Sequence, residues 1–211
     1  MIGFERVLIL SPHTDDGEFG CAGSVARLIE EGREVYYTTF SICEDSVPEG
    51  FPKDILETEV KRATEVLGIK SENLIIYKYP VRYHPQNRQA ILEDIIQLRK
   101  EINPGLVFLP LPQDVHQDHR TVAEEGIRAF KHSSILGYEI PWNNLSVRSQ
   151  LFVSLEQRHL DRKIEALGQY KSQSQRYYMD EEFVRALGRL RGGQVGVRYA
   201  EMFEVIRWII R

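Results

Sequence analysis

Short apolar runs alternate with longer segments of helical period over roughly the first 131 residues. The runs predict strands near residues 6–11, 35–41, 73–77 and 105–110. Between them, apolar residues recur at helical spacing and predict helices over residues 23–31, 54–67 and 89–102. Each predicted helix ends at a stop signal, Gly or Asn-Pro. This alternation is typical of an α/β fold with a doubly wound (Rossmann-like), mainly parallel sheet flanked by helices.

The pattern changes after residue 131. Segments 133–142 and 151–155 predict two further strands, and a helix is expected over 156–170. Segment 188–210 joins a predicted Gly-rich turn to an apolar end, for which strand and helix both stay open. No linker rich in Pro, Gly or Ser divides the chain, so we expect one domain over residues 1–211.

Composition narrows the function classes. The chain has 211 residues, a net charge of −4 and no basic footprint for nucleic acid. Cys21 and Cys43 are too few for a disulfide framework and are expected to be reduced core thiols. The first ten residues lack the apolar core of a signal peptide, and no later run has the length of a membrane span. These features predict a cytoplasmic protein without a membrane span.

The first candidate site is the stretch SPHTDDGEFG, directly after the first predicted strand. It places His13, Asp15, Asp16 and Glu18 close together, where the carboxylates repel one another unless a cation lies among them. Open α/β sheets bind ligands at this end of a strand. The acidic turn lacks the G-x-G-x-x-G spacing and would repel a pyrophosphate, which argues against nucleotide binding. Glu18 is either a further ligand or, as we favour, a carboxylate at a helix start.

The second candidate site is DVHQDH, which follows the predicted strand at 105–110. His116 and His119 are three residues apart at a helix start and share one side of it, with Asp118 between them. The two loops together supply nitrogen and oxygen donors with an open position, as in catalytic zinc sites. The alternative is a pair of unrelated solvated loops. Spacing alone does not tell Asp15 from Asp16, or His116 from His119, as the ligand.

These motifs resemble the LmbE-like (PIG-L) family of zinc-dependent de-N-acetylases, whose signature is a His-Pro-Asp-Asp-Glu loop and a later His-x-Asp-His loop. Residues 138–144 (YEIPWNN), 170–173 (YKSQ) and 199–203 (YAEMF) are similar to the family's later blocks, in the same order. The resemblance therefore extends over nearly the whole chain. It supports the same α/β fold.

The resemblance also implies roles. The implied metal ligands are His13, Asp16 and His119, and the implied metal is zinc, with Fe²⁺ or another divalent ion as the alternative. Asp15 would be the general base, His116 would stabilise the oxyanion, and Asp118 would orient the ring of His116. The mechanism so implied uses a metal-activated water.

The sequence departs from the family pattern without losing a ligand. Thr14 stands where proline is usual, Gly17 where glutamate is, and Gln117 where proline often precedes Asp-His. Leu56, three residues before Glu59, stands where many members carry arginine. This last difference concerns substrate contacts more than chemistry.

The predicted function is hydrolytic removal of an N-acetyl group from an N-acetylated amino sugar or sugar conjugate. The alternatives are a metal-dependent amidase on a non-sugar acyl-amine and a catalytically silent carbohydrate-binding member. His84 is a candidate for the substrate mouth, with a surface position as the alternative. Trp142 is expected beside the pocket, with an aromatic sugar platform as the alternative. The expected partner is a small amino sugar, and a homo-oligomer stays open.

Overall fold

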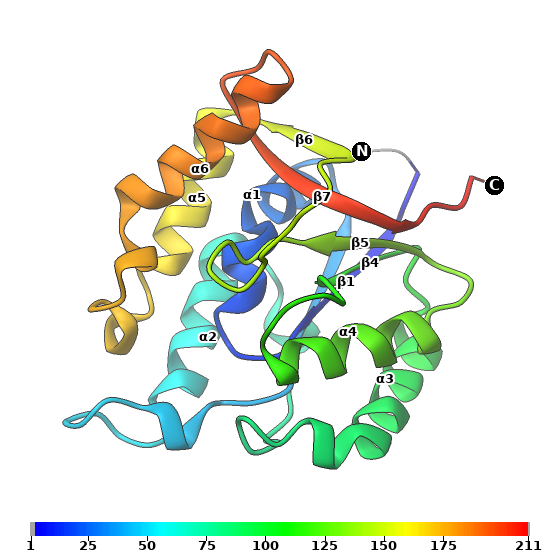
Figure 1. The fold of residues 1–211 in the computed structure, drawn as a ribbon, viewed down its shortest axis with the longest axis vertical. Coiled ribbons are helices and arrows are strands. Elements are labelled where there is room, and N and C mark those ends of the chain that lie inside the picture. The colour runs from blue at the N-terminus through cyan, green and yellow to red at the C-terminus, as the bar shows by residue number, and fades with distance from the viewer. Residues whose placement is uncertain (1–2, 211) are drawn as a thin grey trace.

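A computed structural model describes residues 3–210 and contains one sheet of seven strands (Figure 1). The strand order is β3-β2-β1-β4-β5-β7-β6. The strands are β1 (Arg6–Ser11), β2 (Glu34–Thr39), β3 (Leu74–Ile76), β4 (Leu106–Pro110), β5 (Ser134–Tyr138), β6 (Leu151–Leu155) and β7 (Tyr199–Arg207). The first five in chain order pair in parallel, whereas β7 runs antiparallel to both β5 and β6. The predicted doubly wound, mainly parallel sheet is confirmed.

Helices cover both faces of this sheet (Figure 1). They are α1 (Asp16–Glu30), α2 (Ile55–Leu67), α3 (Arg88–Ile102), α4 (Gln117–Ala129), α5 (Gln157–Leu167) and α6 (Glu181–Gln194). One apolar cluster lies between the sheet and α1, α2, α5 and α6. A second lies between the opposite face and α3 and α4. Within residues 3–210, no helix has the length and apolar character needed to cross a membrane.

The order of the central strands creates the place for a site. The chain leaves β1 through α1 towards β2 and β3 on one side, whereas β4 and β5 lie on the other side of β1. The loops after β1 and β4 therefore diverge at a topological switch point, which is where open α/β sheets bind ligands. The two motif loops of the sequence are these two loops.

Helix α1 starts earlier than predicted, at Asp16 instead of near Gly23. Gly17 and Gly20 therefore lie inside the helix. A Cβ atom at Gly20 would lie 2.3 Å from Cδ2 of Tyr138, and one at Gly17 would lie 2.6 Å from the Tyr37 hydroxyl. These glycines allow close packing of the helix on the sheet. Glycine has a low helix propensity, so the sequence pattern predicted a loop at these positions and placed the start of α1 too late.

The Gly-rich turn predicted in segment 188–210 is wrong in part. Gly188, Gly192 and Gly193 all lie within α6, and the apolar end forms strand β7. A Cβ at Gly192 would lie 2.7 Å from the carbonyl oxygens of Val197 and Arg198. Glycine thus lets the returning chain pass close to the helix.

The packing of α1 predicts opposite effects for two Gly-to-Ala substitutions in helices. Gly20→Ala should lower the free energy of unfolding by about 1–3 kcal/mol, because the new methyl group overlaps the Tyr138 ring. Gly193→Ala in α6 meets no atom within 4 Å and should raise it by up to about 1 kcal/mol. Denaturant titration of both variants measures the difference, and equal stability of the two would contradict this account.

Candidate metal centre

The loop after β1 is a tight turn fastened by its own polar groups. The Ser11 hydroxyl donates to the carbonyl of His13 at 2.5 Å and accepts the amide of Gly17 at 2.9 Å. The amide of His13 donates to Oδ2 of Asp16 at 2.8 Å. Short side-chain to backbone bonds of this kind fix turn geometry locally. They place the side chains of His13 and Asp16 next to each other.

The loop after β4 is fastened in the same way at the start of α4. Oδ1 of Asp114 accepts the amide of His116 at 2.8 Å. Nδ1 of His116 accepts the amide of Asp118 at 3.2 Å and so caps the helix. The first turn of α4 then directs His119, which is 2% exposed, towards the β1 loop.

Three donor atoms from the two loops form a nearly equilateral triangle. The three edges join Nδ1 of His13, Nε2 of His119 and Oδ2 of Asp16, and each measures 3.2 Å. An ion with tetrahedral coordination and ligand bonds of about 2.0–2.1 Å needs donor atoms about 3.3–3.4 Å apart. Two imidazoles and a carboxylate with this spacing fit zinc or a similar divalent ion.

Two buried aspartates hold the far nitrogens of the two histidines. Oδ2 of Asp118 lies 3.0 Å from Nε2 of His13, and Oδ2 of Asp114 lies 2.9 Å from Nδ1 of His119. Both carboxylates have fully buried side chains. A partner on the far nitrogen fixes the ring orientation and leaves the near nitrogen free to bind a metal.

The expected role of Asp118 is therefore wrong in its target. Its carboxylate accepts from His13, and also from the amides of Arg82 at 2.6 Å and His84 at 3.1 Å. His116 is held instead by the backbone amide of Asp118. The carboxylate faces a different ring because the ring of His13 and the amides of Arg82 and His84 gather around it.

The charges of the site reinforce one another. Burial alone would lower the pKa of His119, but Asp16 and Asp114 outweigh it and raise that pKa to about 10. Burial would also raise the pKa of Asp16, but His119 and His13 hold it well below its ordinary value. In the absence of a metal, carboxylates and protonated imidazoles thus stabilise each other in this buried place.

His116 lies close to the triangle but differs in its tautomer. Three imidazoles form an alternative ligand set, because one ring nitrogen each of His13, His116 and His119 lies within 4.8 Å of the others. Nδ1 of His116 accepts a hydrogen bond, however, which leaves the proton of the neutral ring on Nε2. Burial and the neighbouring histidines lower its pKa to about 4. The ring is therefore a hydrogen-bond donor towards the cavity.

Asp15 is the carboxylate without a fixed partner. Its side chain lines the cavity and accepts no hydrogen bond from another described residue. Burial and the nearby Asp16 raise its pKa, while Arg176 and His13 oppose this. The structure therefore separates the two aspartates of the motif, since Oδ2 of Asp16 contacts both His13 and His119, whereas the carboxylate of Asp15 has no such partner among the described residues.

Glu18 lies behind the site in the first turn of α1, at the helix start that we favoured. It is fully buried, and the hydroxyls of Tyr37 and Tyr170 lie within hydrogen-bond distance of its carboxylate. Burial raises its pKa to about 8. Both tyrosine hydroxyls also contact the carbonyl of Thr14, at 2.9 and 2.7 Å. Glu18 thus belongs to the support of the loop.

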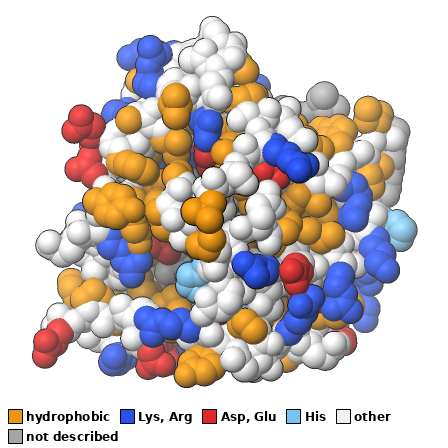
Figure 2. All heavy atoms as spheres, viewed as in Figure 1, with side chains coloured by type: hydrophobic (Ala, Val, Ile, Leu, Met, Phe, Trp, Pro, Cys, Tyr) orange, Lys and Arg blue, Asp and Glu red, His pale blue; other side chains and the backbone are white. Residues whose placement is uncertain are grey.

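The donor triangle opens into a cavity of about 240 Å³. In Figure 2 histidine atoms are visible within a depression on this face of the molecule. Trp142 lines the cavity, as expected, and stacks on Tyr178 with ring centres 3.7 Å apart. His84 is fully buried and is absent from the described residues that line the cavity, so both positions considered for it are wrong. A hydrogen bond from the backbone amide of His84 to Oδ1 of Asp118 holds this residue in the interior.

Sequence reasoning missed three residues of this site. Asp114 stands five residues before His119, within hydrogen-bond reach across one turn, and the need of a ligating histidine for a carboxylate could have indicated it. Arg82 and Arg176 also line the cavity. They lie in irregular segments far apart in the chain, and no local pattern indicates them.

Comparison with known families agrees with this geometry. The family model described as GlcNAc-PI de-N-acetylase (PIG-L) matches residues 8–130. The match covers more than half of the chain and includes both motif loops.

Similar sequences and structures extend the match. The uncharacterized deacetylase YaiS of Escherichia coli (strain K12) is 31% identical over 174 residues, which cover 79% of this chain and 90% of that protein. Diacetylchitobiose deacetylase of Thermococcus kodakarensis is 28% identical over 83% of this chain, which spans only 63% of that relative's length. The solved N,N'-diacetylchitobiose deacetylase of Pyrococcus horikoshii shares the fold, with a TM-score of 0.80 at 24% identity over 96% of this chain and 84% of that one.

The hydrogen bond from His119 to Asp114 predicts a metal-affinity effect. Asp114→Asn should weaken Zn²⁺ binding by about 10–100-fold, because the ring of His119 loses its charged partner. Asp54→Asn removes the same charge at an exposed position and should leave the affinity unchanged. Competition titration against a chelator measures both, and a wild-type affinity in Asp114→Asn would remove Asp114 from the support of the site.

Proposed function

The chain belongs to the PIG-L family, and we propose that it is a metal-dependent deacetylase that removes the N-acetyl group from an N-acetylated amino sugar or its conjugate. The observation that carries this proposal is the donor triangle of His13, Asp16 and His119 beside an unpaired carboxylate, Asp15, and a donor ring, His116. The name of the Thermococcus relative, diacetylchitobiose deacetylase, supports an amino-sugar substrate.

The triangle is the proposed metal site, with zinc as the proposed ion and Fe²⁺ as the alternative. An ion bound there would act as a Lewis acid that polarises the acyl carbonyl and makes an attacking water more acidic. By holding their far nitrogens, Asp114 and Asp118 would keep His119 and His13 turned towards such an ion. The carboxylate of Asp16 would offset part of the ion's charge.

Asp15 is the proposed general base. Amide hydrolysis requires that the attacking water lose a proton while the C–N bond is still intact, and the nearest carboxylate without a fixed partner is Asp15. The proton taken up there is then available to the leaving amine as the C–N bond breaks. Asp16 could not exchange protons as readily, because its Oδ2 is engaged by His13 and His119.

His116 is the proposed oxyanion donor. Negative charge develops on the acyl oxygen as water adds, and the ring of His116, which carries its proton on Nε2, lines the same cavity. A well-placed donor of this kind is worth about 3 kcal/mol of transition-state stabilisation. Trp142 is a proposed substrate contact, although one face of its ring is already covered by Tyr178.

A substrate panel tests the proposed reaction. Purified protein should release acetate from methyl N-acetylglucosaminide, N,N'-diacetylchitobiose or UDP-N-acetylglucosamine, and much less from N-acetyl-alkylamines. Removal of the metal with a chelator should abolish turnover, and Zn²⁺ or Fe²⁺ should restore it. Turnover of alkylamines alone would favour a general amidase, whereas sugar binding without acetate release from the metal-loaded protein would favour a silent binding protein.

The two aspartates of the first motif should separate in mutation. Asp15→Asn should lower kcat by roughly 10²–10⁴-fold, because the general base is lost, while the metal content stays stoichiometric. His119→Ala should instead lose the metal, because one corner of the triangle is removed. Elemental analysis with kcat for both variants makes the distinction. Loss of metal from Asp15→Asn would make Asp15 a ligand.

A further inference from the structure

Two arginines line the cavity, and neither forms an ion pair with a described carboxylate. Arg82 lies after β3, and Arg176 lies between the 3₁₀ turns at Lys171–Gln173 and Tyr177–Met179. Among residues 3–210, neither guanidinium has a carboxylate within 4.0 Å. Leu56, which also lines the cavity from α2, carries no charge. The cations of this cavity therefore come from its two flanking loops.

The backbone of Arg82 has a conformation that glycine would adopt at lower cost. Its φ is +71°, a conformation that glycine adopts freely and that costs a residue with a Cβ about 1 kcal/mol or more. The hydrogen bond from the backbone amide at this position to Asp118 would form with glycine as well. The guanidinium donates one hydrogen bond, from Nη2 to the Ser46 hydroxyl at 3.0 Å, and its other donors have no partner among residues 3–210.

Arg176 is held by aromatic side chains. Its Nη1 donates to the hydroxyl of Tyr178, and its guanidinium lies 5.7 Å from the centre of that ring. Tyr178 in turn stacks on Trp142, which packs against Phe19 of α1 with ring centres 4.5 Å apart. A planar cation positioned in this way loses little conformational freedom when it binds an anion.

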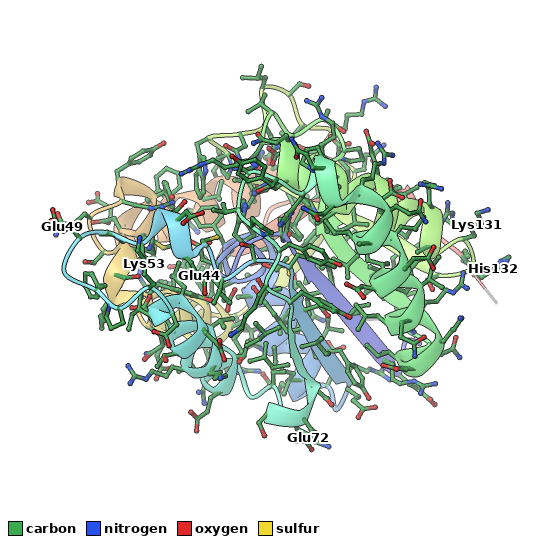
Figure 3. All side chains as sticks on the ribbon, turned by 90° about the horizontal axis from the view of Figure 1, so that it is seen from below. Glu44, Glu49, Lys53, Glu72, Lys131 and His132 are labelled. Atoms are coloured by element: carbon green, nitrogen blue, oxygen red, sulfur yellow. The ribbon has the colours of Figure 1, made fainter. Side chains whose placement is uncertain are left out.

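The remaining charges of the cavity do not cancel these two cations at its mouth. Asp16 is engaged by His13 and His119 at the base of the cavity. The acidic residues Glu44 and Glu49 belong to the loop between β2 and α2, with Glu49 at its outer end (Figure 3), and neither is among the described residues that line the cavity. Among the described residues that line the cavity, Asp15 is the remaining carboxylate, and it faces Arg176.

We propose that Arg82 and Arg176 form a subsite for an anionic group, carboxylate or phosphate, attached to the amino sugar. This inference rests on the proposed function, because it places the acyl group at the donor triangle and the rest of the substrate towards the mouth. Free guanidinium donors bind carboxylate and phosphate oxygens through charge-assisted hydrogen bonds. With a neutral sugar bound, these donors would form hydrogen bonds with water instead.

Matched glycosides of N-acetylglucosamine test the subsite. The methyl glycoside is neutral, the carboxymethyl glycoside carries a carboxylate, and the 2-phosphoethyl glycoside carries a phosphate. At low ionic strength, kcat/KM should be about tenfold higher for at least one anionic substrate than for the neutral one, mainly through KM. The ratio should fall as salt is added. The two anionic arms identify which group is preferred.

Arginine variants assign the effect to the subsite. Arg82→Gln and Arg176→Gln should each lower the anionic-to-neutral ratio of kcat/KM at least threefold, and the double variant should bring it close to one. Arg62→Gln, an exposed position on α2, removes the same charge and should leave the ratio unchanged. A wild-type ratio near one, or a ratio unaffected by both subsite variants, overturns the proposal.

A binding measurement separates this proposal from the proposed reaction. The deacetylated glycosides are not hydrolysed further, so calorimetry gives their Kd without turnover. A tighter Kd for an anionic glycoside that is lost in the double variant supports the subsite even if no acetate is released, in which case the proposed reaction fails alone. Equal Kd values for all three glycosides overturn the subsite even if acetate is released.

Discussion

The site depends on holding imidazoles and carboxylates against each other with little water between them. Burial disfavours charge, yet the donor atoms of His13, Asp16 and His119 lie 3.2 Å apart. Asp114 and Asp118 make this arrangement stable, because each takes the proton-bearing nitrogen of one histidine. Asp114 comes from the loop after β4 and Asp118 from the first turn of α4, so this one segment supports ligands on both sides of the switch point.

The first motif loop is supported by parts of the chain far away in sequence. The carbonyl of Thr14 accepts from the hydroxyl of Tyr170, which follows α5, at 2.7 Å. Lys163 donates to the carbonyl of Phe19 at 2.5 Å, and Glu201 accepts the amide of Gly23 at 3.0 Å. Lys163 and Glu201 also form an ion pair with each other, at 2.7 Å. Because Phe19 and Gly23 are four residues apart in α1, this pair bridges one turn of the helix and ties α1 to α5 and β7. The later sequence blocks thus hold the loop in place.

The sequence predicted well what local pattern determines. The apolar runs identified β1 to β6, and their loops identified both motifs, because a buried strand and a liganding loop each require particular residue types in a row. It failed where a residue's role depends on tertiary packing. The glycines of α1 allow close contact with Tyr37 and Tyr138. The histidine that Asp118 contacts depends on which ring the fold brings next to its carboxylate. Arg176 is placed by a stack of rings that no local spacing reveals.

The chemistry of the site and the shape of its mouth are also physically coupled. Cys43 and Arg82 both line the cavity with positive φ, at 51° and 71°, and such conformations persist only where surrounding contacts hold them. The contact that holds Arg82 is the bond from its amide to Oδ2 of Asp118, the same oxygen that lies 3.0 Å from Nε2 of His13. A shift of the rim loop at Arg82 would therefore also change the orientation of a proposed metal ligand. It follows that the loop at the mouth and the ligand set cannot vary independently, and that a change of specificity at Arg82 is tolerated only when the backbone stays in place.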